Sequence, residues 1–325
     1  MNETVRVACV QAEPVILDRG RTIERLASLT AEAAGAGAQL VVFPETFVPA
    51  YPSSVWAKFL AGWADPRAKA AFVQLAGESV DVPGPDCDRL GEIAREHEVW
   101  LVTGVNERDP TRPGTLYNSL LYHGPDGRLA LHHRKLVPTN HERMVWGQGD
   151  GGGLRALQTS LGRIGGLICW ENYMPLARFS LYESGVEIYI ASTADDGDAW
   201  QATLVHIARE SRAFVVSPCH FQRAGSYPES FPLRDELAGL DLLGRGGSAI
   251  LSPDGSYLAG PLYDEEGILY ADLEPDRLYE ERQRFDPAGH YHRPDVLELR
   301  VRPQRGAATS GPSAPSSRAG RASRA

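Results

Sequence analysis

One cysteine, Cys169, stands where a strand-like run ends and a polar turn begins. The apolar residues 164–168 predict a strand, and residues 175–183 show helical periodicity. A thiol between a strand end and a helix start lies among backbone N–H groups and near the positive end of the helix dipole, which favour an anion. Cys169 is therefore a candidate nucleophile. The alternative is a structural cysteine in the core, since free cysteine is among the most buried residue types.

Glu45 and Lys135 occupy two further strand ends. Glu45 follows the apolar run 39–43, and Lys135 lies near the end of residues 129–136. Charged side chains are seldom placed against apolar strands without a partner or a function, and in open α/β sheets the reacting groups collect at the carboxyl ends of the strands. Together with the thiol they could serve as general base and cation. Taken singly, Glu45 could be a charge at a sheet rim and Lys135 a solvated strand end.

The elements that must position these residues alternate between strand and helix, which predicts the α/β class. Residues 5–11, 18–34 and 39–43 form a predicted βαβ unit. Two hairpins share a Pro-Asp-Gly turn, which suggests two similar halves of one sheet-on-sheet domain. The glycine-rich loop 149–153 leads into neither Lys-Ser/Thr nor a helix, so it is expected to be a plain connection. Helices are also predicted at 66–75, 86–97, 175–183 and 200–212, strands at 99–105, 186–192 and 214–217, and hairpins at 118–136 and 248–259, with strand 267–273 completing the second hairpin.

Composition places the chain among soluble globular proteins. Its 325 residues are 42% hydrophobic and carry a net charge of −9, which argues against nucleic acid or an anionic membrane as a partner. No run reaches membrane-spanning length, and the first residues lack a signal-peptide layout. One domain is expected over residues 1–300, followed by a disordered Gly-, Ser-, Ala-, Pro- and Arg-rich tail at 303–325. The four cysteines show neither zinc-type spacing nor a disulfide framework, which favours a reducing cytoplasm: Cys9, Cys87, Cys169 and Cys219.

Three short motifs resemble the Glu, Lys and Cys motifs of the nitrilase superfamily. They are residues 43–45, 134–139 and 169–172. Further motifs are similar to the branch of true nitrilases, with small departures at Val137 and His141. These are Trp170 directly after the cysteine, residues 138–143 with 146–150, Trp200-Gln201-Ala202-Thr203, and residues 285–295.

The resemblance implies a four-layer αββα sandwich and a homodimer that extends into larger or spiral assemblies. It implies a hydrolase that takes an organic nitrile and two waters to a carboxylic acid and ammonia. Strand alternation lets only one of His132 and His133 face inward, so neither a metal nor an organic cofactor is expected. Lys135 would lower the pKa of the Cys169 thiol and stabilise charge developing on nitrogen. Glu45 would move protons as general base and acid through a thioimidate and a thioester, and Glu142 would orient Lys135 or water. The backbone N–H of Trp170 would help to hold the oxyanion, an interaction worth about 3 kcal/mol.

The substrate side of the site is predicted from aromatic residues. Residues 47–63, which include Tyr51, are expected to form a loop and short helix that wall a pocket. An apolar pocket would suit aliphatic or arylaliphatic nitriles. Its predicted lining also includes Trp56, Phe59, Trp63, Tyr173 and Trp200.

Two other functions remain open at this point. An amidase, an N-carbamoyl hydrolase, or a nitrilase that stops at the amide would use the same Glu, Lys and Cys; Trp170 argues against the first two by resemblance. The other alternative is a non-catalytic scaffold in which Cys169 is simply buried.

Overall fold

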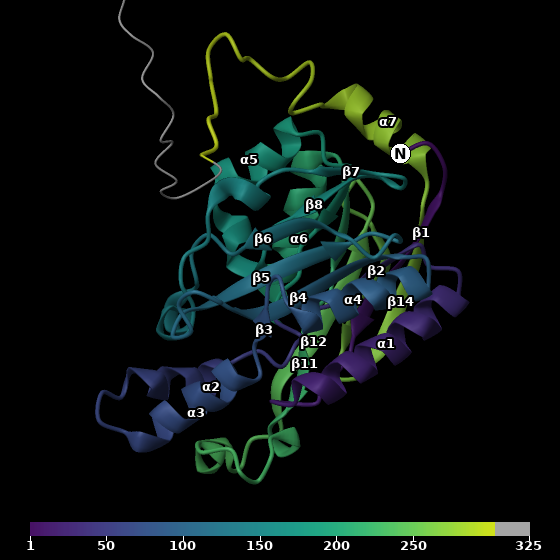
Figure 1. Ribbon diagram of the computed structural model, residues 1–325. Helices are drawn as coiled ribbons and strands as arrows, with labels where there is room; N and C mark the ends of the chain where they lie inside the picture. The colour runs from purple at the N-terminus through teal and green to yellow at the C-terminus, as the bar shows by residue number, and fades with distance from the viewer. Residues whose placement is uncertain (303–325) are drawn as a thin grey trace, which may run out of the picture.

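The computed structural model describes residues 1–302, and the tail predicted at 303–325 lies outside the described residues. Two seven-stranded sheets pack face to face, and each is covered on its outer side by helices (Figure 1). The sheet order is β14-β1-β2-β4-β5-β6 with β3 beside β4 in one sheet, and β11-β12-β10-β9-β8-β7 with β13 beside β12 in the other. The predicted four-layer αββα sandwich is confirmed.

The first sheet grows from the predicted βαβ unit. β1 and β2 pair in parallel, as do β2 and β4, because helical segments carry the chain back between them. The hairpin β5–β6 then extends the sheet with antiparallel pairing. The strands are β1 (Val5–Gln11), β2 (Leu40–Val42), β3 (Val80–Asp81), β4 (Trp100–Arg108), β5 (Leu116–His123), β6 (Leu129–Arg134) and β14 (Gly267–Leu273).

The second sheet repeats this plan, with parallel pairs β8–β9 and β9–β10 followed by the hairpin β12–β13. Residues 267–273 form a strand as predicted, but the prediction that this strand completes the second hairpin is wrong. β14 crosses to the first sheet and pairs with β1, where its apolar Leu273 joins the inter-sheet core. The strands are β7 (Leu157–Thr159), β8 (Gly162–Gly166), β9 (Ile188–Ile190), β10 (Phe214–Ser217), β11 (Phe221–Arg223), β12 (Leu242–Leu251) and β13 (Tyr257–Tyr263).

The helices cover the outer faces of the sheets. α1 and α4 bury their apolar faces against the first sheet, and α5 and α6 bury theirs against the second. α7 was not predicted, because Leu278 is its one buried residue and the rest of the helix is charged or polar. The helices are α1 (Arg19–Gly35), α2 (Ser54–Ala57), α3 (Pro66–Gly77), α4 (Pro85–Glu96), α5 (Pro175–Glu183), α6 (Asp198–Ser211) and α7 (Pro275–Arg284).

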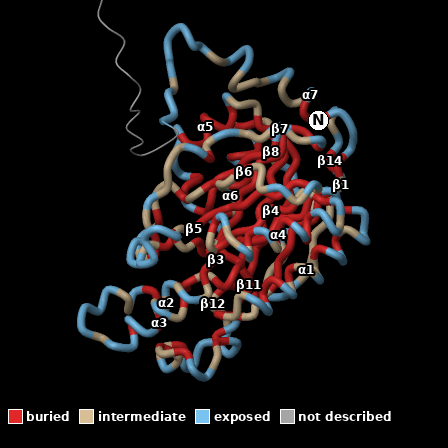
Figure 2. The backbone as a smooth tube through the Cα atoms, viewed as in Figure 1, coloured by how far each residue is buried: buried red, intermediate tan, exposed pale blue. Residues whose placement is uncertain are grey.

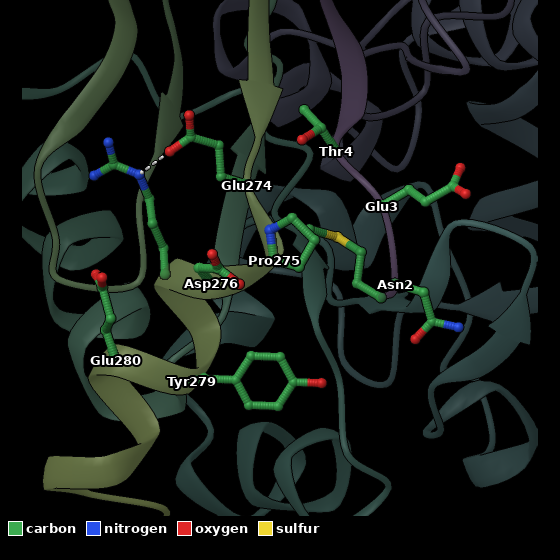
Figure 3. Close-up of a pocket in the computed structure, with 10 residues that line it drawn as sticks. Asn2, Glu3, Thr4, Glu274, Pro275, Asp276, Tyr279 and Glu280 are labelled. Carbon is green, nitrogen blue, oxygen red and sulfur yellow. Dashed lines mark hydrogen bonds and ion pairs between the residues drawn. The ribbon is translucent and has the colours of Figure 1, made fainter.

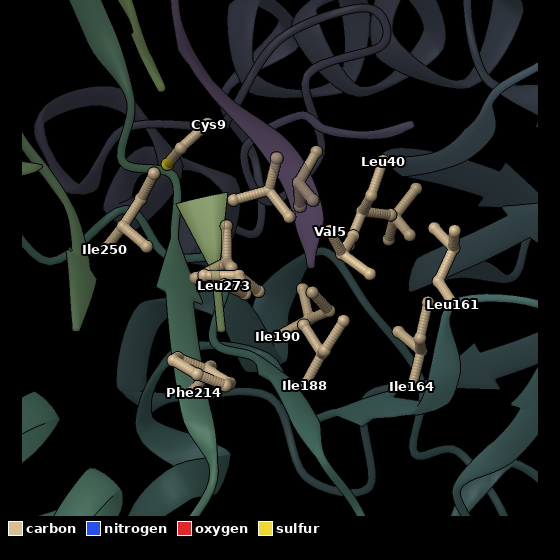
Figure 4. Packing of buried hydrophobic residues seen from close by; sticks show 14 of the residues in the cluster. Val5, Cys9, Leu40, Leu161, Ile164, Ile188, Ile190, Phe214, Ile250 and Leu273 are labelled. Carbon is tan, nitrogen blue, oxygen red and sulfur yellow. The ribbon is translucent and has the colours of Figure 1, made fainter. Parts of the chain in front are cut away.

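The core between the sheets is aliphatic. Val5, Leu40 and Leu273 from one sheet face Ile188 and Ile190 from the other (Figure 4). Buried positions concentrate in the strands, whereas α3 and the segment after α7 carry many exposed positions (Figure 2). Burial of these alternating aliphatic faces holds the two sheets together. It thereby brings the strand ends that bear Glu45, Lys135 and Cys169 to one edge of the sandwich.

Candidate active site

A cavity of about 330 Å³ opens at this edge and contains the candidate nucleophile. Its wall includes Tyr51, Glu142, Cys169 and Trp170. The remaining lining residues are mostly polar and come from four segments of the chain: Ser53, Ser54, Thr139, Asn140, His141, Ala194, Asp195, Asp196 and Leu243.

A larger cavity, of about 750 Å³, lies at the other end of the molecule between residues 1–4 and α7 (Figure 3). Its polar wall includes the carboxylates of Glu274, Asp276 and Glu280. None of the predicted site residues reaches it, and the described residues place no cysteine on its wall. The chemistry therefore belongs to the smaller cavity.

Lys135 is the centre of the site and is almost completely buried. It follows β6, and its backbone N–H donates to the Asn118 carbonyl at 2.8 Å. Its Nζ donates to Glu45 Oε1 at 2.8 Å and to Glu142 Oε2 at 2.7 Å. Burial alone would lower the pKa of Lys135, but the two carboxylates outweigh burial and raise it. Lys135 is therefore a fixed ammonium group.

The two carboxylate oxygens of Glu45 differ in their hydrogen bonds. Oε1 accepts from Lys135 and from Asn118 Nδ2, the latter at 2.6 Å, whereas Oε2 is buried with no hydrogen-bond partner among residues 1–302. The backbone carbonyl of Glu45 accepts a hydrogen bond from His220 Nε2. Burial and the nearby Glu142 raise the pKa of Glu45, against the effect of Lys135. A carboxylate with a raised pKa and a free oxygen is suited to accept a proton.

Cys169 occupies a strained turn directly after the strand segment. Its φ is +52°, in the left-handed region that residues other than glycine seldom adopt. Its N–H donates to the Ser192 carbonyl at 2.8 Å, and Thr193 Oγ1 donates to Sγ at 3.2 Å. Holding such a conformation costs about 1–3 kcal/mol, which packing elsewhere must offset.

The surroundings of the Cys169 thiol act on its pKa in opposite directions. Burial raises the pKa of Cys169 and the Glu45 carboxylate adds to the rise, while Lys135 lowers it only in part. Lys135 thus acts in the predicted direction, while burial and Glu45 favour the protonated thiol. A proton on the sulfur would pass to a base when the sulfur attacks.

Glu142 lies within a short helical turn, Asn140–Met144, that caps itself. Its Oε2 accepts from the Thr139 N–H at 2.7 Å as well as from Lys135, and its Oε1 accepts from the Tyr51 hydroxyl at 2.8 Å. The structure therefore brings together Glu45, Lys135, Cys169, Glu142 and Tyr51. The glycine-rich loop 149–153, expected to be a plain connection, does not line the cavity.

Two residues of the cysteine motif have roles that the sequence did not reveal. The buried Glu171 accepts from the Ile168 N–H at 2.9 Å, from the Leu136 N–H at 2.8 Å and from His133 Nε2 at 2.9 Å. It thus ties the nucleophile turn to the chain that follows Lys135. Asn172 Nδ2 donates to the Cys169 carbonyl at 2.9 Å. The signal was available, since a carboxylate two residues after Cys169 in an apolar region needs partners.

The predicted aromatic wall is only partly found. Trp170 lines the cavity, is 50% exposed and donates through its indole N–H to Asp195 Oδ2 at 2.7 Å. Within residues 1–302, no group accepts a hydrogen bond from its backbone N–H, which leaves that donor available. Tyr173 lies outside the lining, with its hydroxyl 2.9 Å from Thr203 Oγ1.

Trp200 and three other predicted wall residues are also absent from the lining, so the predicted aromatic residues that line this cavity are Tyr51 and Trp170. Trp200 is fully buried because its position on α6 points it at the sheet, where its indole N–H donates to Ser217 Oγ at 3.2 Å. Trp56 and Phe59 pack in a separate core cluster, and Trp63 is 95% exposed.

The two adjacent histidines of β6 face opposite sides, as strand alternation predicts. His132 Nε2 lies 2.7 Å from Glu107, and His133 lies 2.9 Å from Glu171. In the part of the chain that the structure describes, no three His, Cys, Asp or Glu side chains are grouped to hold a metal ion.

Known proteins resemble this chain along nearly its whole length. The family model described as carbon-nitrogen hydrolase matches residues 6–283. An aliphatic nitrilase of Sinorhizobium fredii (strain HH103) is 45% identical, covering 91% of this chain and 95% of that protein. The bifunctional nitrilase/nitrile hydratase NIT4B of Nicotiana tabacum is 43% identical, covering 92% and 86%. Nitrilase 1 of Arabidopsis thaliana is 39% identical, covering 92% and 87%.

Solved structures share the fold. A carbon-nitrogen hydrolase from Helicobacter pylori G27 superposes with a TM-score of 0.69 at 22% identity, over 90% of this chain and 96% of its own. Nit3 of Saccharomyces cerevisiae, a member of branch 10 of the nitrilase superfamily, gives a TM-score of 0.67 at 21% identity, over 89% and 97%. With the matched family and the close nitrilase relatives, this establishes that the chain belongs to the carbon-nitrogen hydrolase family, in its nitrilase branch.

Proposed function

We propose that this enzyme hydrolyses an organic nitrile to the carboxylic acid and ammonia, with Cys169 as nucleophile. The observation that carries the proposal is the buried Lys135 ammonium between two carboxylates, in the site whose cavity holds the thiol. The relatives named as nitrilases support the substrate class.

The first half of the reaction forms a thioimidate. Glu45 Oε2 takes the thiol proton as Sγ bonds to the nitrile carbon, and Glu45 then returns that proton to the nitrogen. Lys135 stabilises the negative charge that develops on nitrogen. Because burial and Glu45 raise the pKa of Cys169, transfer of its proton to Glu45 would accompany attack by the sulfur.

The second half consumes two waters. Glu45 activates the first, which adds to the thioimidate carbon; ammonia then leaves and a thioester remains. The second water adds to the thioester, the carbon–sulfur bond breaks, and the acid departs as the thiol regains its proton. The free backbone N–H of Trp170 and the Lys135 ammonium would hold the tetrahedral oxyanion. Glu142 holds Lys135 in position.

The test is ammonia release by the Cys169→Ala variant. We expect turnover of any accepted nitrile to fall to background, because no other thiol lines the cavity within the described residues. Cys87→Ala is the matched control, since Cys87 is a buried cysteine of α4 and is expected to leave turnover unchanged. Unchanged turnover in Cys169→Ala would sink the proposal and favour the scaffold alternative.

A second product, the amide, should be assayed in the same way, because several relatives are named as bifunctional nitrilase/nitrile hydratase. The amide forms when sulfur, rather than ammonia, leaves the first tetrahedral intermediate. Comparing matched nitrile and amide substrates separates a nitrilase from an amidase or N-carbamoyl hydrolase. An enzyme that turns over the amide faster than the nitrile would favour the amidase alternative.

Aliphatic and arylaliphatic nitriles remain the proposed substrate class, within a cavity of about 330 Å³. Its polar lining near Asp195 and Asp196 also favours nitriles with a polar far end. A panel read by ammonia release decides among them.

We also propose a homo-oligomer and a cytoplasmic location. Exposed Leu176 and Met174 at the start of α5 would be covered in an assembly. Light scattering on the purified protein tests the oligomer. Free thiols at all four cysteines fit a reducing compartment. No helix within residues 1–302 has both the length and the apolar character to cross a bilayer.

A further inference from the structure

The loop after β9 makes three hydrogen bonds to Cys169 and Trp170. The Ser192 carbonyl accepts from the Cys169 N–H at 2.8 Å, Thr193 Oγ1 donates to Cys169 Sγ at 3.2 Å, and Asp195 Oδ2 accepts from the Trp170 indole at 2.7 Å. Of these contacts, that of Thr193 reaches the reacting atom itself.

The direction of the Thr193 hydroxyl proton is fixed by its surroundings. The Asp195 N–H donates to Thr193 Oγ1 at 2.9 Å and so occupies an oxygen lone pair. The hydroxyl has one proton, and Sγ is the acceptor that the structure gives it. Thr193 is fully buried, and its backbone is held by bonds to the Pro218 carbonyl and from the His220 N–H. The donor therefore cannot easily turn away or be replaced by water.

The sulfur lies in surroundings that oppose a negative charge. It is buried, and the Glu45 and Glu142 carboxylates both disfavour a thiolate beside them. Lys135 is the cation that offsets them, but its Nζ already donates to both carboxylates. A neutral hydrogen-bond donor directed at the sulfur stabilises a thiolate without adding another charge to the site.

We propose that Thr193 is a further catalytic group, whose hydroxyl stabilises the Cys169 sulfur as it loses its proton and directs the S–H toward Glu45. The sulfur accepts from Thr193, so the thiol proton must point elsewhere. The buried, unpartnered Glu45 Oε2 is the base that lacks a donor. For nitrile turnover this inference rests on the proposed function, but its effect on the thiol does not.

The test is the second-order rate constant for alkylation of Cys169 by iodoacetamide between pH 7 and 9, together with kcat/KM for an accepted nitrile. Thr193→Val keeps the shape and removes the donor. We expect alkylation and kcat/KM both to fall about 10-fold or more, mainly through kcat, because a hydrogen bond to a charged group is lost. Thr193→Ser, which keeps the hydroxyl, should restore both values to within about threefold of the original enzyme.

The matched control is Thr103→Val, which makes the same change at a fully buried threonine whose hydroxyl has no partner among residues 1–302. It should leave both rate constants unchanged. If Thr193→Val does not fold, Thr193→Ala takes its place with the same expectation.

A role confined to structure gives a different result. Loosening the turn would expose the sulfur and speed alkylation, so an unchanged or faster alkylation in Thr193→Val would overturn the inference. Failure of Thr193→Ser to restore alkylation would also overturn it. Absence of nitrile turnover in the original enzyme would contradict the proposed function alone, since alkylation still reports on Thr193.

Discussion

At the scale of single residues, the site is governed by one ammonium group shared between two carboxylates. Glu45 and Glu142 both bond to Lys135 Nζ, but they differ in their other partners. Glu142 accepts from Tyr51 and Thr139 as well, so both of its oxygens are engaged. Glu45 keeps one oxygen free. This difference supports the proposal that Glu45 is the base and that Glu142 has a supporting role.

Glu142→Gln tests that assignment. The glutamine side chain keeps the shape of Glu142 but removes its negative charge. It also places an NH₂ group against one of the donors that Glu142 now accepts from, so kcat should fall about 10- to 100-fold. Because the Glu142 charge raises the pKa of Glu45, its loss should lower that pKa. The acid limb of the kcat/KM profile should then move to lower pH.

Tyr51→Phe is the comparison variant, because it removes one donor to Glu142 and leaves the charges as they are. It should lower kcat less and leave the acid limb in place. A Glu142→Gln enzyme with unchanged kcat would show that Glu142 has no part in the reaction.

At the scale of elements, the site depends on how closely strands and turns approach. Gly104 of β4 lies against the backbone that carries Glu45, and a Cβ there would meet the Pro44 carbonyl and lie 2.5 Å from the Thr46 nitrogen. Thr46 itself has a φ of +44°, so this segment has little freedom to move away. Gly104 therefore allows the backbone that carries Glu45 to approach β4 closely, although it makes no hydrogen bond with the Glu45 side chain.

Gly104→Ala should displace Glu45 without changing any group of the site. We expect kcat to fall at least 10-fold, and overpacking to lower the free energy of unfolding by about 1–3 kcal/mol. Steady-state kinetics and urea unfolding measure the two effects. Gly35→Ala is the control: nothing lies within 4 Å of its Cβ position at the end of α1, so kcat should stay unchanged. Full activity in Gly104→Ala would contradict the steric argument.

At the scale of the whole molecule, two buried histidines link stability to pH. Burial lowers the pKa of His123 and of His220 to about 4 each. In the unfolded chain each would titrate near ~6.5. Between these values the unfolded state binds more protons, so stability is full above about pH 6.5 and falls as pH drops toward 4. Each histidine contributes a loss of up to about 3 kcal/mol over that range.

Urea unfolding at several pH values between 4 and 7 checks this prediction. His123→Gln should make the decline shallower by removing one of the two contributions. His206→Gln is the control, since the His206 side chain is 62% exposed and should leave the slope unchanged. A free energy of unfolding that does not vary between pH 6.5 and 5 would contradict the assignment of both histidines as buried and neutral.

Much of the fold follows from the sequence because its signals are local. Alternating apolar runs and glycine stops predicted α5, β1 and β10 at their observed bounds, and helical spacing predicted α1 to within one residue at each end. The exceptions depend on distant contacts. β14 was assigned to its neighbour in sequence, whereas its partner is β1, more than 250 residues away. Helix α7 was not predicted, because a single buried residue, Leu278, does not produce an apolar stripe in the sequence.

For the site, the sequence by itself determined the residue types. Glu45, Lys135 and Cys169 each stand after a strand, and parallel strands bring such ends to one edge of a sandwich. Only the tertiary structure decided what surrounds them: burial opposes a thiolate at Cys169, Glu171 ties two strand ends together, Thr193 reaches the sulfur, and Trp200 turns into the core. The physical reason is that burial, charge and hydrogen-bond direction depend on groups far apart in the chain, which no local pattern can bring into contact.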